Sequence, residues 1–436
     1  MNVFECFKIA KGGEITSKIQ QIPLLWAFAV KYDGRHRARL VAGGHVADDL
    51  EKDYYSGVVS LETIRIAFVV AALLALNVIA ADIASACTQA LTEELVFKIA
   101  GPEFGKLAGM KLIIVKALYG LKASGAMWHM KWADNLRKMG FRPCIADPDL
   151  WMRKKDNYYE YVAVIVDDLL VFSREPESII EPITTYFEYE IKGVGPPEYY
   201  SGADMGYDQE RKCWTKSAKK YVKNVVDKIE KLHDRKLKNV GSPLDAGDHP
   251  ELDETDFLDE DETRKYQMLI GSAQWAITLG RYDIQQATNL LARFATMPRE
   301  GHLERALRLF GYLKHYSRAK LHVDPQNMDL TGINFEDHVW QDLHPDAEEY
   351  VADNAPEPLV RGLSLVTFKD ASHASQLDTR RSVSRIMHFL GSAVMSTYSK
   401  RQNVVESSTY GSELVAARLA VEQQLALRFK LRMMGI

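Results

Sequence analysis

Cysteine is scarce in this sequence, and its few copies lie far apart. Cys6, Cys87, Cys144 and Cys213 are spread over 436 residues and form no C-x-x-C pair. A small disulfide-stapled domain or a cysteine-based zinc site needs more closely spaced cysteines, so the spacing argues against both. It favours a reducing compartment, and we expect an intracellular protein.

Long apolar runs are missing as well. The most apolar stretch, residues 66–81, is interrupted by Asn77 and is shorter than the roughly 20 residues that a membrane-spanning helix needs. No charged-then-apolar leader with a small-residue cleavage site opens the chain. We therefore expect a soluble globular protein of two or three domains with no membrane partner, in which 66–81 is a buried helix running into a strand.

The chain has no overall excess of positive charge, because its net charge is −4. Basic residues are nevertheless concentrated in 211–238, where eleven Lys or Arg stand against three Asp or Glu. Val222, Val225, Val226 and Ile229 recur there at helical spacing, which predicts a basic amphipathic helix. This pattern fits a solvated surface helix as well as a phosphate-binding one.

Two acidic stretches with turn residues, 244–262 and about 324–358, are predicted to be mobile linkers or loops. Strand-like and helix-like runs alternate before the first stretch, which is an α+β pattern. Helical runs lie between the two stretches. Short strands and a long helix follow the second, with Leu414, Ala417, Val421 and Leu425 on one face of that helix.

Two adjacent carboxylates, Asp167 and Asp168, stand inside the apolar run 161–173. An unpaired buried charge costs several kcal/mol, so we expect the acids at the turn of a hairpin that projects them into a cleft. Their mutual repulsion would be offset by Mg²⁺, which prefers oxygen ligands. Asp82, also flanked by apolar residues, is the best candidate for a third carboxylate. Three acids holding two Mg²⁺ suit nucleotidyl transfer, and solvated turn acids are the alternative.

A second Asp-Asp pair offers an internal comparison. Asp48 and Asp49 lie in the polar segment “VADDLEKD”. We expect this pair to be plain surface loop.

An ordered series of motifs resembles the reverse transcriptase domain of copia-type retrotransposons, and the resemblance covers nearly all of the chain. The motifs are “RARLVAGG” (37–44), “YYSGVVSLETIRIAF” (54–68), “AADIASA” (80–86), “KALYGLKASGAMW” (116–128), “GFRPCIADPDLWM” (140–152) and “VDDLLVFS” (166–173). The resemblance implies a right-hand polymerase with fingers, palm and thumb, a connection segment and a partial α/β ribonuclease H-like domain.

The implied domains are fingers and palm at 1–205, a thumb-like basic helix region at 206–243, an acidic linker at 244–265, a helical connection at 266–323, a second acidic linker at 324–361 and a truncated ribonuclease H-like domain at 362–436. The implied partners are an RNA template, a DNA primer, their RNA–DNA hybrid and dNTPs. The family works in a cytoplasmic particle or the nucleus. The sequence does not indicate an oligomeric state.

The resemblance also assigns roles to single residues. Asp82, Asp167 and Asp168 fall on the catalytic acids that hold two Mg²⁺, or Mn²⁺ in their place. The nucleotide-binding positions are Arg37, Arg39, Cys87, Tyr119, Gly120 and Lys122. The primer and template positions are Ile165, Val166, Lys216, Lys219, Lys220 and Lys223. The motif that contains Lys122 also fits a simple turn before a helix, and the sequence does not say which of the two arginines faces the ligand.

In the last domain, Asp370 and Glu413 fall on metal-binding positions of ribonuclease H. The alternative for Glu413 is a first-turn acid favoured by the helix dipole. The chain ends before the strand that supplies the family's next metal-binding Asp. We therefore expect no efficient ribonuclease H activity.

Several positions depart from the family pattern. Ile165 replaces the Tyr of Tyr-Val-Asp-Asp, Gly125 stands near a missing Pro, and Ser372 stands where a second acid is common. Cys87 replaces an aromatic residue that excludes the ribose 2′-hydroxyl, so discrimination against ribonucleotides should be weakened. Two hypotheses follow: an RNA-directed DNA polymerase, or a catalytically decayed relic that keeps only the fold and nucleic-acid binding.

Overall fold

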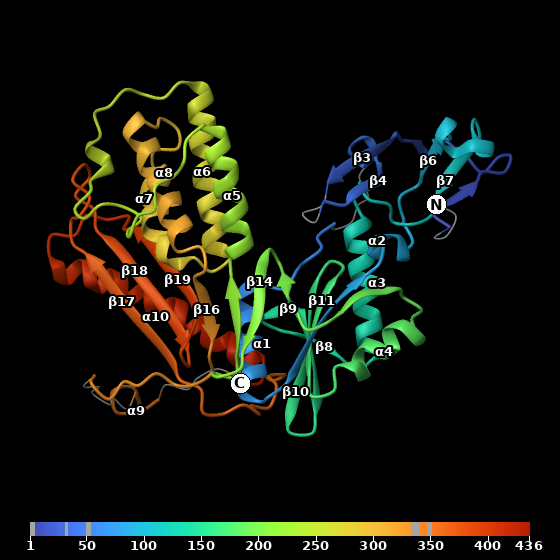
Figure 1. Cartoon of the computed structure of the whole chain (residues 1–436). Coiled ribbons are helices and arrows are strands. Elements are labelled where there is room, and N and C mark those ends of the chain that lie inside the picture. The colour runs from blue at the N-terminus through green and yellow to red at the C-terminus, as the bar shows by residue number, and fades with distance from the viewer. Residues whose placement is uncertain (1–4, 31–33, 49–53, 334–339, 347–350) are drawn as a thin grey trace. The chain divides into compact units, whose positions relative to one another are not determined.

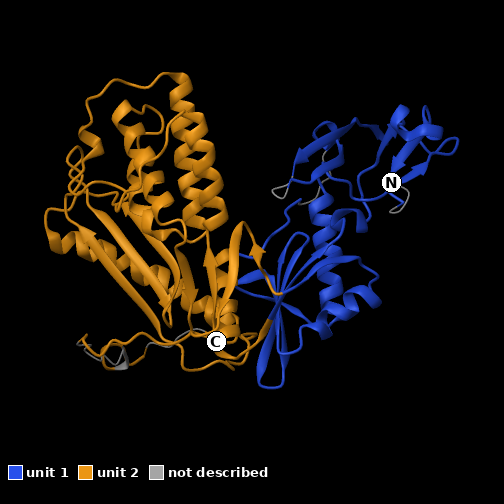
Figure 2. Cartoon of the chain, viewed as in Figure 1, with its two compact units in different colours: residues 1–60, 78–195 blue, residues 61–77, 196–436 orange. Residues whose placement is uncertain are grey.

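The computed structural model describes residues 5–30, 34–48, 54–333, 340–346 and 351–436. The chain forms two compact units (Figure 2). The first consists of residues 1–60 and 78–195, and the second of residues 61–77 and 196–436. Among the described residues, no helix is both long and apolar enough to cross a membrane.

The first unit contains three sheets (Figure 1). A six-stranded sheet has the order β12-β5-β11-β10-β9-β8, a four-stranded sheet has the order β1-β7-β6-β2, and β3 pairs with β4 alone. The bounds are β1 (Phe7–Ile9), β2 (Gln20–Gln21), β3 (Leu24–Val30), β4 (His36–Ala42), β5 (Asn77–Ile83), β6 (Val96–Ile99), β7 (Lys111–Ile114), β8 (Arg142–Cys144), β9 (Asp147–Lys155), β10 (Tyr158–Ile165), β11 (Asp168–Ser173) and β12 (Ile191–Gly195).

Helices cover one face of the six-stranded sheet. The short α2 (Ala86–Gln89) follows β5, and α3 (Ser124–Lys138) and α4 (Glu177–Thr185) pack on the sheet (Figure 1). Alternate residues of three strands join these helices in one buried cluster: Ile79, Ala81, Ile83, Val162, Val164, Leu169 and Val171. Because successive side chains of a strand point to opposite faces, the residues between them point away from the helices.

The second unit combines a helix bundle with two antiparallel sheets. Its helices are α1 (Leu61–Leu73), α5 (Lys219–Leu232), α6 (Glu260–Thr278), α7 (Gln285–Ala292), α8 (Glu300–His315), α9 (Trp340–Leu343) and α10 (Thr409–Met433). Its strands are β13 (Tyr199–Tyr200), β14 (Ala203–Asp208), β15 (Cys213–Ser217), β16 (Lys320–Val323), β17 (Leu365–Ser372), β18 (Val383–Leu390) and β19 (Ala393–Arg401). The sheets run in the orders β13-β14-β15-β16 and β17-β18-β19.

Helices α5 to α8 share one apolar core, to which Val222, Tyr266 and Phe310 contribute. The buried carboxylate of Glu230 on α5 accepts hydrogen bonds from Lys236 at 2.6 Å and from Lys314 of α8 at 2.8 Å. These two ammonium groups lower the pKa of Glu230 to about 2. The charge is therefore satisfied within the bundle.

The expected helix and strand at 66–81 are confirmed as α1 and β5, but α1 belongs to the second unit. Its apolar residues pack on β15, β16 and β19, and the ring of Phe68 lies 5.3 Å from that of Trp214. This corrects the predicted domain 1–205, which had included the helix. The segments predicted to be thumb, connection and ribonuclease H-like domain lie in one compact unit, in which the Asn289 amide of α7 donates to the Ser399 carbonyl of β19 at 2.7 Å.

The acidic segment 244–265, predicted to be a linker or loop, is mostly loop before α6 begins at Glu260. Asp248 and Asp253 bind the guanidinium group of Arg305 at 2.8 and 2.5 Å. Asp259 caps α6 by accepting a hydrogen bond from the Glu262 amide at 2.9 Å. The acids are thus satisfied by a distant arginine and a helix end.

Three other predictions concern the second acidic segment, the Asp48–Asp49 pair and the apolar stripe on α10. In the second acidic segment, residues 334–339 and 347–350 lie outside the described residues, as does Asp49 of the comparison pair. Asp48 is exposed, as expected. The predicted stripe on α10 is present, but Leu414, Val421 and Leu425 face solvent, with 55–56% of each residue exposed. Small residues on the other side, such as Ala416, pack inward instead.

Candidate active site

Asp82, Asp167 and Asp168 lie at neighbouring positions of the six-stranded sheet, on β5, the β10–β11 turn and β11. β5 lies directly beside β11. Asp82 stands between the inward-facing Ala81 and Ile83, and Asp168 precedes the inward-facing Leu169, so both acids point away from α3 and α4. The β10–β11 turn supplies Asp167. The expected hairpin is confirmed, with the difference that Asp168 already belongs to β11 and pairs with Ile165.

The turn that carries the acidic pair is held from two sides. The Ile83 amide at the end of β5 donates to the Asp167 carbonyl at 2.9 Å. The indole Nε1 of Trp128 on α3 donates to the Val166 carbonyl at 2.7 Å. Val166 has a φ of 57°, a left-handed conformation that is strained for a β-branched residue. Its surroundings therefore hold the turn in a conformation that valine alone would avoid.

The three acids influence one another electrostatically. Partial burial raises the pKa of Asp168 to about 6, and the negative charges of Asp167 and Asp82 contribute to this increase. The Asp168 residue still keeps contact with solvent. Crowded carboxylates of this kind favour a proton or a cation between them.

The donor set suits a hard divalent cation. Carboxylate oxygens are the ligands that Mg²⁺ prefers. Within the described ranges, no three Asp, Glu, His or Cys side chains are already gathered closely enough to hold a metal ion. The three acids would therefore have to turn their side chains toward a shared ion.

An arginine, a tyrosine and a cysteine border the acids. The Arg39 guanidinium lies 4.4 Å from the centre of the Tyr119 ring. Burial raises the pKa of the Cys87 thiol, Asp167 raises it further, and Arg39 opposes the shift. Burial also raises the pKa of Tyr119. Cys87, Asp167 and Asp82 raise this pKa further, whereas Arg39 lowers it. These charges therefore belong to one electrostatic neighbourhood.

Arg37 and Arg39 lie on the same face of the β3–β4 hairpin, because residues two apart on a strand share a face. They stand opposite Ala29 and Ala27 on β3. Both are half-buried. The interactions with Tyr119 and Cys87 identify Arg39 as the one next to the acids.

Gly120 and Lys122 shape the loop beside Arg39. Gly120 has a φ of 95°, and a Cβ there would come within 2.1 Å of the Ala42 carbonyl oxygen. The Lys122 ammonium donates to the Ala47 carbonyl at 2.7 Å. In this structure, Lys122 thus joins two loops.

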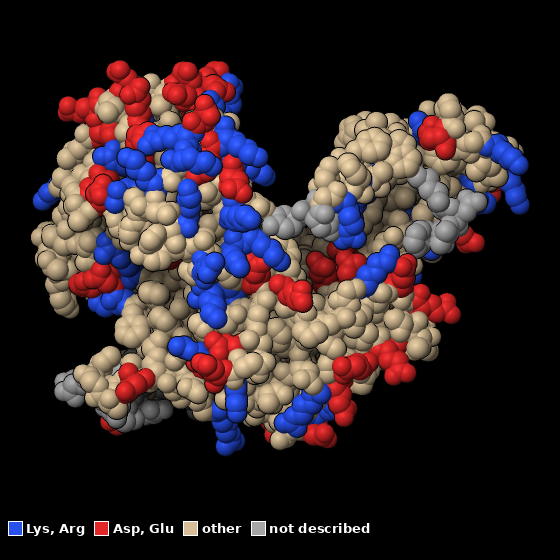
Figure 3. All heavy atoms as spheres, viewed as in Figure 1, with Lys and Arg blue, Asp and Glu red and all other residues tan. Residues whose placement is uncertain are grey.

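The predicted primer and template lysines differ in their surroundings. Lys219 and Lys223 are exposed on α5, in a part of the second unit where Lys and Arg side chains gather (Figure 3). Lys220 is exposed but pairs with Asp204 at 3.2 Å. The prediction that Lys216 contacts primer or template is wrong. Lys216 lies in β15, only 8% of it is exposed, and its ammonium group donates to the Thr278 carbonyl at 3.3 Å. It is not a surface contact for nucleic acid.

Asp370 and Glu413 each have a cation of their own. Asp370 on β17 pairs with Arg385 of β18 at 3.0 Å. Glu413 on α10 pairs with Lys369 at 2.7 Å and accepts a hydrogen bond from the Ala371 amide at 3.2 Å. Lys369 and Asp370 are successive strand residues, so their side chains leave β17 on opposite faces. The two acids are not brought together as the sequence had led us to expect.

Two residues beside the acids were missed by the sequence analysis. Trp128 positions the Val166 turn, and Lys192 on β12 stands directly opposite Asp82 in the antiparallel register. The helical pattern of residues 124–138 indicates a buried tryptophan, but it does not name a partner 38 residues away. The pairing of β12 with β5 has no local signal.

Comparison with known proteins identifies the family of this chain. Residues 7–240 match the family described as reverse transcriptase (RNA-dependent DNA polymerase). The chain is 25% identical over 431 residues to the retrovirus-related Pol polyprotein from transposon TNT 1-94 of Nicotiana tabacum, covering 94% of this chain and 29% of that protein. It is 24% identical over 411 residues to the corresponding polyprotein from transposon RE1 of Arabidopsis thaliana, covering 92% of this chain and 25% of that protein.

A third relative is the transposon Ty1-DR1 Gag-Pol polyprotein of Saccharomyces cerevisiae, with 28% identity over 334 residues, which cover 72% of this chain and 18% of that protein. The chain thus spans less than a third of the length of each of these relatives. The family match covers more than half of the chain. The chain therefore belongs to the reverse transcriptase family and is related to the Pol polyproteins of copia-type transposons.

Proposed function

We propose that this chain is an RNA-directed DNA polymerase that extends a DNA primer on an RNA template with dNTPs. One observation carries the proposal: Asp82, Asp167 and Asp168 lie on the adjacent strands β5 and β11 and the turn before β11, where partial burial and the charges of Asp167 and Asp82 together raise the pKa of Asp168 to about 6. A fold gains nothing in stability from crowding carboxylates in this way. A cationic ligand or a reaction accounts for it better.

The three acids would hold two Mg²⁺, or Mn²⁺ in their place. The bound ions would supply Lewis-acid activation of the primer 3′-hydroxyl and charge stabilisation for the leaving pyrophosphate. The strained Val166 turn and the Trp128 hydrogen bond keep the Asp167 and Asp168 backbone in place for this task. Ile165 and Val166 would lie beside the primer end.

The nucleotide would be bound by residues around Arg39. Its guanidinium group suits a triphosphate because it offers several fixed donors. Arg37 and the loop of Tyr119, Gly120 and Lys122 would complete this side of the pocket. Cys87 would stand beside the sugar, where a thiol leaves more room than an aromatic ring.

The nucleic acid would be held by phosphate contacts from α5. Lys219 and Lys223 are exposed there, and Lys220 could exchange Asp204 for a phosphate. We expect little ribonuclease H activity, because Asp370 and Glu413 are paired with separate cations.

The test is extension of a labelled DNA primer on an RNA template with Mg²⁺. Asp167→Asn should reduce single-turnover extension by roughly 10²–10³-fold or more. Asp134→Asn is the matched control, since the Asp134 side chain is 67% exposed near the C-terminal end of α3 and forms an ion pair with Arg137. Absence of extension by the unaltered chain, with the hybrid still bound in a salt-dependent way, would instead identify a relic that keeps only nucleic-acid binding.

A further inference from the structure

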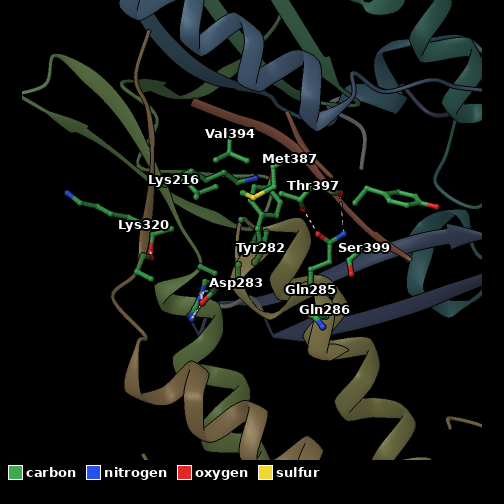
Figure 4. A pocket seen from close by; sticks show the side chains of 18 of the residues that line it. Lys216, Tyr282, Asp283, Gln285, Gln286, Lys320, Met387, Val394, Thr397 and Ser399 are labelled. Atoms are coloured by element: carbon green, nitrogen blue, oxygen red, sulfur yellow. Dashed lines mark hydrogen bonds and ion pairs between the residues drawn. The ribbon is translucent and has the colours of Figure 1, made fainter. Parts of the chain in front are cut away.

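A cavity of about 510 Å³ lies inside the second unit (Figure 4). Its walls come from β15 and β16, from the segment that joins α6 to α7, and from β18 and β19. Much of the wall is apolar, with Leu279, Leu321, Ile386, Met387 and Val394 among its residues. The volume and the apolar wall suit a small organic molecule.

Lys216 is the unusual residue of this wall. Only 8% of it is exposed, and its ammonium group donates to one carbonyl, that of Thr278, at 3.3 Å. Within the part of the chain that the structure describes, no carboxylate pairs with it. A buried ammonium group without a counter-charge costs several kcal/mol.

The other cations of the wall differ from Lys216 because each faces an acid. Arg281 pairs with Asp283 at 2.7 Å, and Arg385 pairs with Asp370 at 3.0 Å. The Lys320 ammonium lies 3.9 Å from an Asp208 oxygen. The absence of a partner is therefore particular to Lys216 among these four.

The surroundings of Lys216 add positive charge and unused donors. Burial, together with the positive charge of Arg65 on α1, lowers the pKa of Lys216 to about 8. The Arg65 Nε atom and the Tyr282 hydroxyl are both buried and lack a hydrogen-bond partner in the described structure. Tyr282 also lines the cavity. All three groups can donate, and together they call for an acceptor that carries negative charge.

We propose that this cavity binds a small amphipathic anion, whose negatively charged head pairs with Lys216 and whose apolar body packs against Leu279, Met387 and Val394. The site is separate from the carboxylates of the first unit and does not depend on the proposed polymerase activity.

The test is a titration of the full chain with 8-anilinonaphthalene-1-sulfonate, an aromatic anion that fluoresces in apolar surroundings. We expect saturable binding of one dye molecule per chain. Lys216→Met, which keeps the length of the side chain, should weaken the affinity about tenfold or more, because a charge-assisted hydrogen bond is lost. Lys219→Met is the matched control, since Lys219 is exposed and does not line the cavity.

Competition and a second variant make the test specific. Octanoate should displace the dye, whereas octanol should not, since it has no charge to pair with Lys216. Val394→Trp fills the cavity from β19, leaves Lys216 in place and should also abolish binding. Circular dichroism should show both variants folded, with Lys216→Met melting no lower than the unaltered chain.

Equal binding by the unaltered chain and Lys216→Met would overturn the proposal, as would non-saturable binding or displacement by octanol. Unchanged binding by a folded Val394→Trp would place the dye elsewhere and overturn it as well. Primer extension is measured separately, so a failure here leaves the polymerase proposal untouched.

Discussion

Two regions of this chain contain acids that the sequence resemblance predicts to be metal ligands, and the surroundings of these acids differ in charge. At Asp168, partial burial and the neighbouring negative charges raise the pKa to about 6. At Glu413, the hydrogen bond from Lys369 lowers the pKa. Asp370 likewise has Arg385 beside it. A carboxylate thus has negatively charged neighbours in one region and a positively charged partner in the other.

A sequence motif gives the position of an acid but does not show which charges surround it. A carboxylate surrounded by carboxylates is prepared to receive a cation from solution. A carboxylate that already has an arginine or a lysine must first lose that partner, and a bound metal would have to displace it. We therefore expect the first region to respond to a divalent ion more strongly than the second.

The largest expected effect is on primer extension, and it tests directly whether the two acidic regions differ. Asp82→Asn should lower Mg²⁺-dependent primer extension by roughly 10²–10³-fold or more, because a ligand of the shared cation is lost. Asp370→Asn should change extension less than about twofold, since it removes only an ion pair with Arg385. Single-turnover extension measures both. Equal losses in the two variants would mean that the regions do not differ as described.

Restoring an aromatic ring beside the acids should have the next largest effect. Cys87→Phe should raise the preference for dNTPs over rNTPs by about tenfold or more, because the ring would occupy the space of a ribose 2′-hydroxyl. The measurement is the ratio of kcat/KM for the two nucleotides. Cys87→Ser, which keeps the small size, should leave the ratio unchanged, and a shift in that variant would point to the thiol rather than to its volume.

The support of the acidic turn can be tested with two neighbouring tryptophans. Trp128→Phe removes the donor to the Val166 carbonyl and should cost about 1–3 kcal/mol of unfolding free energy together with a fall in extension. Trp132 is stacked on Trp128 at 6.0 Å, and its indole nitrogen has no hydrogen-bond partner in the described structure. Trp132→Phe should therefore cost less and spare activity, as denaturant unfolding and extension assays would show. The reverse order would exclude a positioning role for Trp128.

The smallest effects are opposite pH dependences of stability. The folded-state pKa of Asp168 is raised, so the folded form binds more protons and the acid costs stability as the pH rises from about 4 to about 6. Asp168→Asn should then stabilise the fold by about 1 kcal/mol at pH 7, a value reduced for the solvent that still reaches Asp168, and by nothing at pH 4.

Glu413 should behave in the other way. Its pKa is lowered in the fold, so its stabilisation is present above the unfolded pKa of about 4.3 and is lost as the pH falls through the folded value. Glu413→Gln should cost about 0.5 kcal/mol at pH 7 and less at pH 3. Chemical denaturation at several pH values measures both variants. Slopes of the same sign would contradict the contrast.

Much of the local structure could be predicted because its causes are local. The alternating and apolar pattern around 161–173 predicted the β10–β11 hairpin, and helical spacing predicted α5 with its buried valines. The Asp pair could be placed at the turn for the same reason: only there can acids leave an apolar strand cheaply. Asp82 could be joined to them only as a candidate, because the adjacency of β5 and β11 is a long-range pairing.

The errors share one physical cause. The acidic stretch of Asp248 and Asp253 was predicted to be a linker or loop, and the sequence did not reveal their partner because Arg305 is more than 50 residues away. Lys216 was predicted to face nucleic acid because composition reports charge but not burial. On α10, the small Ala416 faces inward and the larger Leu414 faces solvent, which reverses the usual assignment of a helix face.

The sequence by itself determined the family, the order of strands and helices, and the place of the acidic pair, because periodicity and turn chemistry act over a few residues. The tertiary structure decided which charges lie near one another. It places Asp82 near Asp168, pairs Lys369 with Glu413, and buries Lys216 beside a cavity. Those outcomes depend on contacts between residues that are distant along the chain, and the strength of a charge interaction is set by its distance and its exposure to water.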